Sequence, residues 1–310
     1  MTKMINGSGK IILIMAELLV AVLFFQLPLS EGAMKFRYIT SVYTDDKGLG
    51  LKQPEGVACS GESLLIVADS GNGRLLRYSY KDGATELGTV EIKVDQLSYP
   101  IKTEINSNGE IFILDRKLRS IVRLSPAGEF RGYLQPVGLP SPTAYVLRSF
   151  TIDRNDNIYI LDILSERVLI LNPEGKYVSQ IKFPDEYGFF SDVAVDFRGA
   201  VLLIDGVGGM VFSAGKNSAS FSPLTSSLKE YVRFSTSLTT DDRARIYLVD
   251  RNGGSIVILG QDGSFLSRQS GRGWKEGSLN YPAQMCINKK GEIFVADTNN
   301  SRVQIFLMVE

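Results

Sequence analysis

The stretch GEIFVADTNNSRVQIF, residues 291–306, decides the fold of this chain. It reads as an apolar strand that ends at an aspartate, a polar turn, and a second apolar strand. The same phrase, in weaker form, occurs five more times upstream. Its most constant residue is the aspartate that ends the first of these two strands. We call these residues the marker aspartates: Asp69, Asp115, Asp162, Asp205, Asp250 and Asp297.

The spacing of the marker aspartates is nearly regular, at 46, 47, 43, 45 and 47 residues. This period is the length of a four-stranded propeller blade. A short apolar strand precedes the marker strand in each unit, and the units continue with further strand patterns. Turns such as Asn108-Gly109 separate the strands, because Asn and Gly adopt the positive φ of tight hairpins. The pattern predicts an all-β, six-bladed β-propeller of four-stranded blades.

The two ends of the repeat array fit together. The last unit stops after its third strand, and residues 34–44 (MKFRYITSVYT) form an additional strand pattern before the first unit. We therefore expect this N-terminal strand to complete the last blade and close the ring. Such pairing would cover a strand edge that would otherwise be exposed.

Residues 1–33 differ from the repeats. Lys3 and Lys10 precede an apolar run at residues 11–25. This is the layout of a cleaved signal peptide. An uncleaved membrane anchor is the alternative, because the apolar stretch is nearly long enough to span a bilayer. We expect an exported protein, periplasmic or extracellular, with a propeller at residues 34–310 and membrane contact only through an uncleaved N-terminal segment.

Composition narrows the possible functions. The chain of 310 residues carries 34 Lys and Arg against 34 Asp and Glu, and a net charge of zero argues against a nucleic-acid partner. Histidine is absent, which removes the commonest general base and metal ligand. Serine–histidine triads, cysteine–histidine pairs and histidine-based zinc sites are excluded. We expect a monomer with no cofactor and no bound metal.

The chain has two cysteines, Cys59 and Cys286, in the first strands of the first and last units. These units would be neighbours in a closed ring. When the first and last units are aligned, Cys286 falls opposite Ala58, one position before Cys59. Neighbouring positions of a strand face opposite sides of the sheet, so the two cysteines have opposite parity. Both side chains therefore point either into the shared interface or away from it. Packed sheets lie about 10 Å apart, whereas a disulfide needs Cα atoms within about 7 Å. This comparison favours buried free thiols, with a disulfide as the alternative.

The units QPEGVACSGESLLIVADSGNGRLLRY and YPAQMCINKKGEIFVADTNNSRVQIF closely resemble NHL repeats. The similarity extends over about residues 35–310, although the fourth unit lacks the Asn and Arg of the motif. The resemblance implies a six-bladed propeller of the TolB-like group, of the bacterial exported type. It does not fix the function, because the family includes ligand-binding modules, sensor domains and a few enzymes.

The marker aspartates suggest a structural role. An aspartate that opens a turn accepts hydrogen bonds from nearby backbone amides. Three of them have an arginine five residues later, and Arg74, Arg167 and Arg302 could pair with them across the hairpin. Because the aspartates recur once per blade, they cannot converge on one ligand. A catalytic or metal-binding ring is therefore disfavoured.

Residues that differ between blades suggest a binding site. The starts of the first strands should surround one mouth of the central channel. The candidate residues there are Glu55, Lys102, Arg148, Asp192 and Gln284. They predict a non-catalytic interaction module that binds a protein or a small ligand, although these charges could simply neutralise one another. The alternative is a metal-dependent hydrolase similar to propeller lactonases, which hold a divalent ion with Glu, Asn and Asp.

Overall fold

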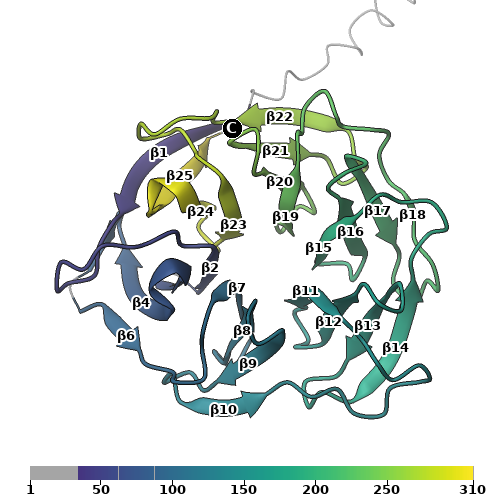
Figure 1. Ribbon diagram of the computed structural model, residues 1–310. Coiled ribbons are helices and arrows are strands. Elements are labelled where there is room, and N and C mark those ends of the chain that lie inside the picture. Colours follow the sequence, from purple (N-terminus) through teal and green to yellow (C-terminus); the bar gives the residue numbers. More distant parts are fainter. Residues whose placement is uncertain (1–33, 62, 87, 310) are drawn as a thin grey trace, which may run out of the picture. The chain divides into compact units, whose positions relative to one another are not determined.

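The computed structural model describes residues 34–309 except 62 and 87, and its strands form six antiparallel sheets around a central axis (Figure 1). Each sheet is one blade. The six-bladed, all-β architecture predicted from the repeats is confirmed.

The strands of blades 1–5 follow the chain order, and blade 6 takes its outer strand from the N-terminal part of the described chain. Blade 1 comprises β2 (Gly56–Ser60), β3 (Leu64–Asp69), β4 (Arg74–Lys81), β5 (Ala84–Thr85) and β6 (Val90–Ile92), and blade 2 comprises β7 (Pro100–Ile105), β8 (Ile111–Asp115), β9 (Ser120–Leu124) and β10 (Phe130–Tyr133). Blade 3 comprises β11 (Leu147–Ile152), β12 (Ile158–Asp162), β13 (Arg167–Leu171) and β14 (Tyr177–Lys182). Blade 4 comprises β15 (Phe190–Val195), β16 (Val201–Asp205), β17 (Met210–Ala214) and β18 (Ser222–Pro223). Blade 5 comprises β19 (Ser235–Thr240), β20 (Ile246–Asp250), β21 (Ser255–Leu259) and β22 (Phe265–Gln269). Blade 6 comprises β23 (Pro282–Ile287), β24 (Glu292–Asp297), β25 (Arg302–Val309) and β1 (Lys35–Val42). The strands nearest the axis are β2, β7, β11, β15, β19 and β23, and in blade 6 the earliest described strand in the chain, β1, is the outermost.

The core lies between the blades. Every residue of β8, β12, β16 and β20 is buried. These strands are continuous apolar runs because a neighbouring blade covers each of their faces. Between blades 1 and 2, for example, Ile66 and Leu75 pack in one cluster with Ile113 and Val122.

The outer strands are less regular than the repeat pattern suggests. In blade 4 the outer strand β18 is only two residues long, and in blade 1 the pairing with β4 is divided between β5 and β6. An outer strand has a partner on one side only, so fewer contacts constrain its length. Short 3₁₀ turns follow the marker aspartates of blades 1 and 6, at η1 (Ser70–Asn72) and η2 (Thr298–Asn300).

The N-terminal strand closes the ring as expected. β1 pairs with β25 in antiparallel register, from Lys35 opposite Val309 to Val42 opposite Val303. Tyr38 lies edge-on to the ring of Phe306, with the two centroids 6.2 Å apart. Two segments from opposite ends of the sequence therefore complete blade 6 (Figure 1).

The expectation of free thiols was wrong, because Cys59 and Cys286 form a disulfide with their Cα atoms 5.9 Å apart. The typical spacing of packed sheets does not apply here. Blades are arranged as wedges, so their innermost strands approach one another most closely at the axis. β2 and β23 are such a pair, and the opposite parity of the two cysteines lets their side chains meet.

The predicted signal peptide or anchor at residues 1–33 lies outside the described residues and stays a prediction. Within residues 34–309, no helix has the length and apolar character needed to cross a bilayer.

Candidate functional site

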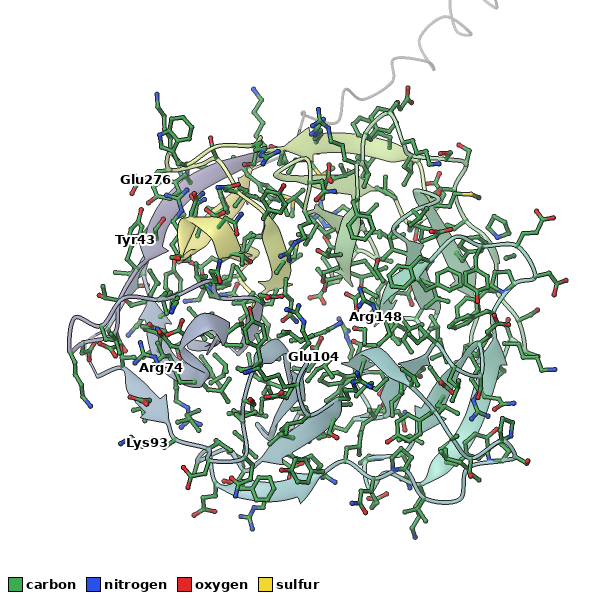
Figure 2. The ribbon with its side chains drawn as sticks, in the orientation of Figure 1. Tyr43, Arg74, Lys93, Glu104, Arg148 and Glu276 are labelled. Carbon is green, nitrogen blue, oxygen red and sulfur yellow. A yellow bond between two sulfur atoms is a disulfide. The ribbon has the colours of Figure 1, made fainter. Side chains whose placement is uncertain are left out.

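The starts of the innermost strands enclose a cavity of about 100 Å³ at one mouth of the channel. All five candidate binding residues line it: Glu55, Lys102, Arg148, Asp192 and Gln284. Figure 2 shows Arg148 beside the central axis. Residues that are up to about 230 positions apart in the chain thus meet at one place, which we call the mouth cavity.

The marker aspartates do not line the mouth cavity. Their carboxylates instead accept hydrogen bonds from backbone amides within each blade. Asp115 accepts hydrogen bonds from the backbone amides of Ser98 and Tyr99, at 2.6 and 2.7 Å, in the link that leads into β7. It also accepts from the amides of Lys117 and Leu118 in the following turn, at 2.9 and 3.0 Å. One carboxylate therefore fixes the link and the hairpin to each other.

In three blades an arginine completes this arrangement. The Nε atoms of Arg74, Arg167 and Arg302 lie 2.8, 2.9 and 2.7 Å from a carboxylate oxygen of Asp69, Asp162 and Asp297, respectively. All six side chains are buried. Figure 2 shows Arg74 within blade 1, well away from the axis. These carboxylates are engaged in the fold, and none of them lines the mouth cavity.

Lys102 and Asp192 form a buried pair across the channel. The Lys102 Nζ lies 2.5 Å from Asp192 Oδ1 and 3.1 Å from Ser149 Oγ. Asp192 Oδ1 also accepts from the Ser149 hydroxyl, and its Oδ2 accepts from the Leu238 amide at 3.0 Å. The network joins blades 2, 3, 4 and 5. Neither charge is available to a ligand unless this network opens.

The Gln284 side chain connects blade 6 with blades 1 and 2. Its Oε1 accepts from the amides of Val57 and Thr103, at 3.0 and 3.1 Å, and its Nε2 donates to the Thr103 carbonyl at 2.9 Å. The side chain therefore extends from blade 6 to blades 1 and 2 and satisfies three polar groups in the channel wall. Gln284 also lines the mouth cavity, but its side-chain amide is already engaged in these hydrogen bonds.

Glu55 is paired with a residue that sequence reasoning missed. Arg116 donates to both carboxylate oxygens of Glu55, at 3.1 and 2.7 Å. Tyr99 donates its hydroxyl to the same carboxylate at 3.1 Å, and Arg251 lies 4.0 Å from it. Arg116 and Arg251 both line the mouth cavity.

A signal for these two arginines was present in the sequence. Each directly follows a marker aspartate, Asp115 or Asp250. The turn after the marker strand lies on the same face as the channel mouth. The residue that follows each marker aspartate is therefore also expected near the mouth. Unlike the aspartates, this position varies between blades.

Arg148 is the charged candidate residue that makes no ion pair within the described part of the chain. Its guanidinium lies over the ring of Phe189, 4.8 Å from the centroid. Its Nε is buried and has no hydrogen-bond partner among the described residues. Burial lowers the pKa of Arg148, as does the nearby Arg116, whereas Asp192 acts in the opposite direction. The Arg148 guanidinium in the mouth cavity thus has no ion pair among the residues that the structure describes, and its Nε donor is unused.

A second cavity of about 190 Å³ continues the channel below Lys102 and Gln284. Glu104 lines it, 3.9 Å from Lys102 Nζ, and Figure 2 shows this residue beside the axis. Burial raises the pKa of Glu104 to about 7; Asp192 raises it further, and Lys102 opposes this. The Cys59–Cys286 disulfide also contributes to the wall of this cavity.

Metal binding would need carboxylates that are already engaged. Glu55 and Asp192 are the two acids of the mouth cavity, and each is held by a cation. Among the residues that the structure describes, no three His, Cys, Asp or Glu side chains are grouped so that they could hold a metal ion.

Comparison with known proteins supports the repeat assignment. Residues 279–306, which include β23 and β24, match the family model described as the NHL repeat. The human NHL repeat-containing protein 3 is 25% identical over 169 residues, which is 52% of this chain and 42% of that protein. The alignment therefore spans less than half the length of this relative.

Solved structures share the architecture. A catalytically inactive histidine-to-alanine form of the Staphylococcus aureus virginiamycin B lyase, with quinupristin, superposes with a TM-score of 0.62 at 12% identity and covers 89% of this chain and 100% of that one. A gluconolactonase from Xanthomonas campestris has a TM-score of 0.62 at 12% identity, over 89% of this chain and 95% of its own. At these identities the likeness shows the fold alone. Together with the matched repeat, it shows that the chain is a six-bladed β-propeller in which residues 279–306 match an NHL repeat.

Proposed function

We propose that this propeller is a non-catalytic binding module whose partner, a protein or a small ligand, docks at the mouth cavity. The observation that carries the proposal is the contrast between two sets of residues. The repeated aspartates are engaged within each blade, whereas the residues that differ between blades converge on one cavity. Such convergence of unlike side chains can build a single asymmetric site.

The enzymatic alternative is a metal-dependent hydrolase, because a gluconolactonase has the same fold. Two features of this chain argue against it. The Glu55 carboxylate is held by both terminal nitrogens of Arg116, and the Asp192 carboxylate is held by Lys102. A cation placed between these acids would have to displace or repel the basic side chains that already neutralise them.

A lyase activity is also disfavoured. The inactive form of the virginiamycin B lyase has alanine in place of a histidine, and this chain has no histidine at any position. General acid–base catalysis at the mouth would depend on a carboxylate or on Lys102. The carboxylates of Glu55 and Asp192 are already paired with basic side chains, and Lys102 is one of these partners.

The test compares binding with hydrolysis. Purified protein should not hydrolyse lactones or esters, and a chelator or added Ca²⁺ should leave its melting temperature unchanged. As a control for fold damage, Asp297→Ala should lower the melting temperature, because it leaves Arg302 buried without its carboxylate. Lactone hydrolysis that is lost with a chelator or on Glu55→Gln would overturn the proposal in favour of the hydrolase.

We also propose that the protein is exported. The Cys59–Cys286 disulfide supports this, because disulfides persist mainly in oxidising compartments outside the cytoplasm. N-terminal sequencing of protein from its native host should then find a mature chain that begins between about residues 31 and 35, as the small-residue cleavage rule requires. A chain that retains Met1 and stays in the cytoplasm would contradict export.

A further inference from the structure

The mouth cavity has more positive than negative charge. Four cationic side chains line it, Lys102, Arg116, Arg148 and Arg251, against the carboxylates of Glu55 and Asp192. Lys102 is matched by Asp192, and Arg116 by Glu55. The positive charges that remain are therefore those of Arg148 and Arg251.

These two arginines lack a close acidic partner. The nearest carboxylate to Arg251 is that of Glu55, at 4.0 Å, which is already bound by Arg116. Arg148 makes no ion pair among the described residues, and its buried Nε has no acceptor. A partly buried guanidinium without a counter-charge is costly to hold, because burial removes water that would otherwise solvate it.

We infer that the mouth cavity is a site for a small oxyanion, the carboxylate or phosphate group of a ligand, held by the guanidinium groups of Arg148 and Arg251. Guanidinium groups match such anions well, since their fork of donors can bind two oxygens at once. The inference rests on the proposed function, and it specifies the chemical class of what that site binds.

The remaining lining sets the size and character of the ligand. A cavity of about 100 Å³ admits one charged group and a short attached chain, but not a large ring system. Ile101, Leu114 and Ala283 offer an apolar wall. The hydroxyls of Ser191 and Thr236 already donate to backbone carbonyls, so the donors for an anion are the two guanidinium groups. These features suit an anionic group with a short apolar body.

The probes follow from this description. Butyrate tests a carboxylate, inorganic phosphate tests a phosphate group, and butyramide is the neutral counterpart of butyrate. Binding to the purified protein is measured by ligand-observed NMR and calorimetry at constant ionic strength. We expect butyrate or phosphate to bind at least about tenfold more tightly than butyramide, and the better of the two identifies the type of oxyanion.

Variants locate the site. Arg148→Gln and Arg251→Gln should each weaken binding of the better anion by roughly tenfold or more, which is the loss expected for a charge-assisted hydrogen bond. Arg131→Gln is the matched control, because Arg131 lies on the outer strand β10 and pairs at the surface with Glu129. It should bind like the parent protein. Unchanged melting temperatures of the two mouth variants would show that the fold is intact.

Two results would overturn the inference. One is that neither anion binds better than butyramide, and the other is that Arg148→Gln binds the anion as tightly as the parent. If butyramide itself binds and mouth variants abolish that binding, the oxyanion inference fails while the binding-module proposal stands. Chelator-sensitive hydrolysis would instead remove the proposed function itself.

Discussion

Removal of residues 34–44 should cost this protein most of its stability. The segment contains β1, which pairs with β25 along its whole length and completes blade 6. Each backbone hydrogen bond lost is worth about 0.5–1.5 kcal/mol. Burial of Val42 and the contacts of Phe36 and Tyr38 with Phe306 are lost as well. The total approaches the roughly 5–15 kcal/mol that stabilises a typical domain.

The measurement compares chains 34–310 and 45–310 by thermal and urea unfolding. The shorter chain should melt far lower or aggregate, because it exposes the long edge of β25. A synthetic peptide of residues 34–44, added in excess, should restore part of the melting temperature by pairing with that edge. A peptide of the same composition in scrambled order should not. Equal melting temperatures for the two chains would mean that β1 is not needed to close the ring.

The repeats allowed the architecture to be predicted because each unit carries its own evidence. An apolar run that ends in an aspartate and continues through a polar turn is a local sequence pattern. Because the pattern occurs six times, an atypical copy does not prevent the blade period from being recognised. The blade of Asp205 is the weakest copy, lacking the Asn and Arg, yet its strands β15, β16 and β17 align like the others. The least regular strands, β5, β6 and β18, are the outer ones, where local sequence is polar and packing is weak.

The positions of the mouth residues could be predicted, but their partners could not. Alignment of the repeats brings Glu55, Lys102 and Asp192 to one end of the channel. Which charge meets which depends on the radius of the ring and on side-chain reach, and neither is encoded in the period. The pairing of Lys102 with Asp192 leaves Arg148 unmatched, so the excess of positive charge became visible only in three dimensions.

The cysteines show the same limit. The alignment of the repeats predicts their opposite parity. The spacing of about 10 Å, however, applies to sheets that pack in parallel layers. In a propeller the spacing between neighbouring sheets varies with distance from the axis. Cys59 and Cys286 lie on the innermost strands β2 and β23, where that spacing is smallest.

Reduction of the Cys59–Cys286 disulfide should have the second largest effect on stability. The two cysteines are separated by 227 residues, so the bond restricts nearly the whole unfolded chain. The loop-entropy relation gives about 5 kcal/mol for a loop of this length, with the usual variation between proteins. The bond also joins blade 1 to blade 6, the blade that contains both β1 and β25. It should therefore hold the ring closed at the junction where β1 alone completes the last sheet.

A reducing agent should lower the melting temperature of the parent protein by about 10–20 °C, given that each kcal/mol shifts it by roughly 2–4 °C in a domain of this size. The double variant Cys59→Ala/Cys286→Ala should melt near the reduced parent and should not respond to the reductant. This comparison separates loss of the bond from general effects of the reagent. The chain 45–310 should be more sensitive to reduction than 34–310, because it has already lost the other device that closes the ring. If the reduced and oxidised parent proteins melt at the same temperature, the disulfide does not stabilise the closed propeller.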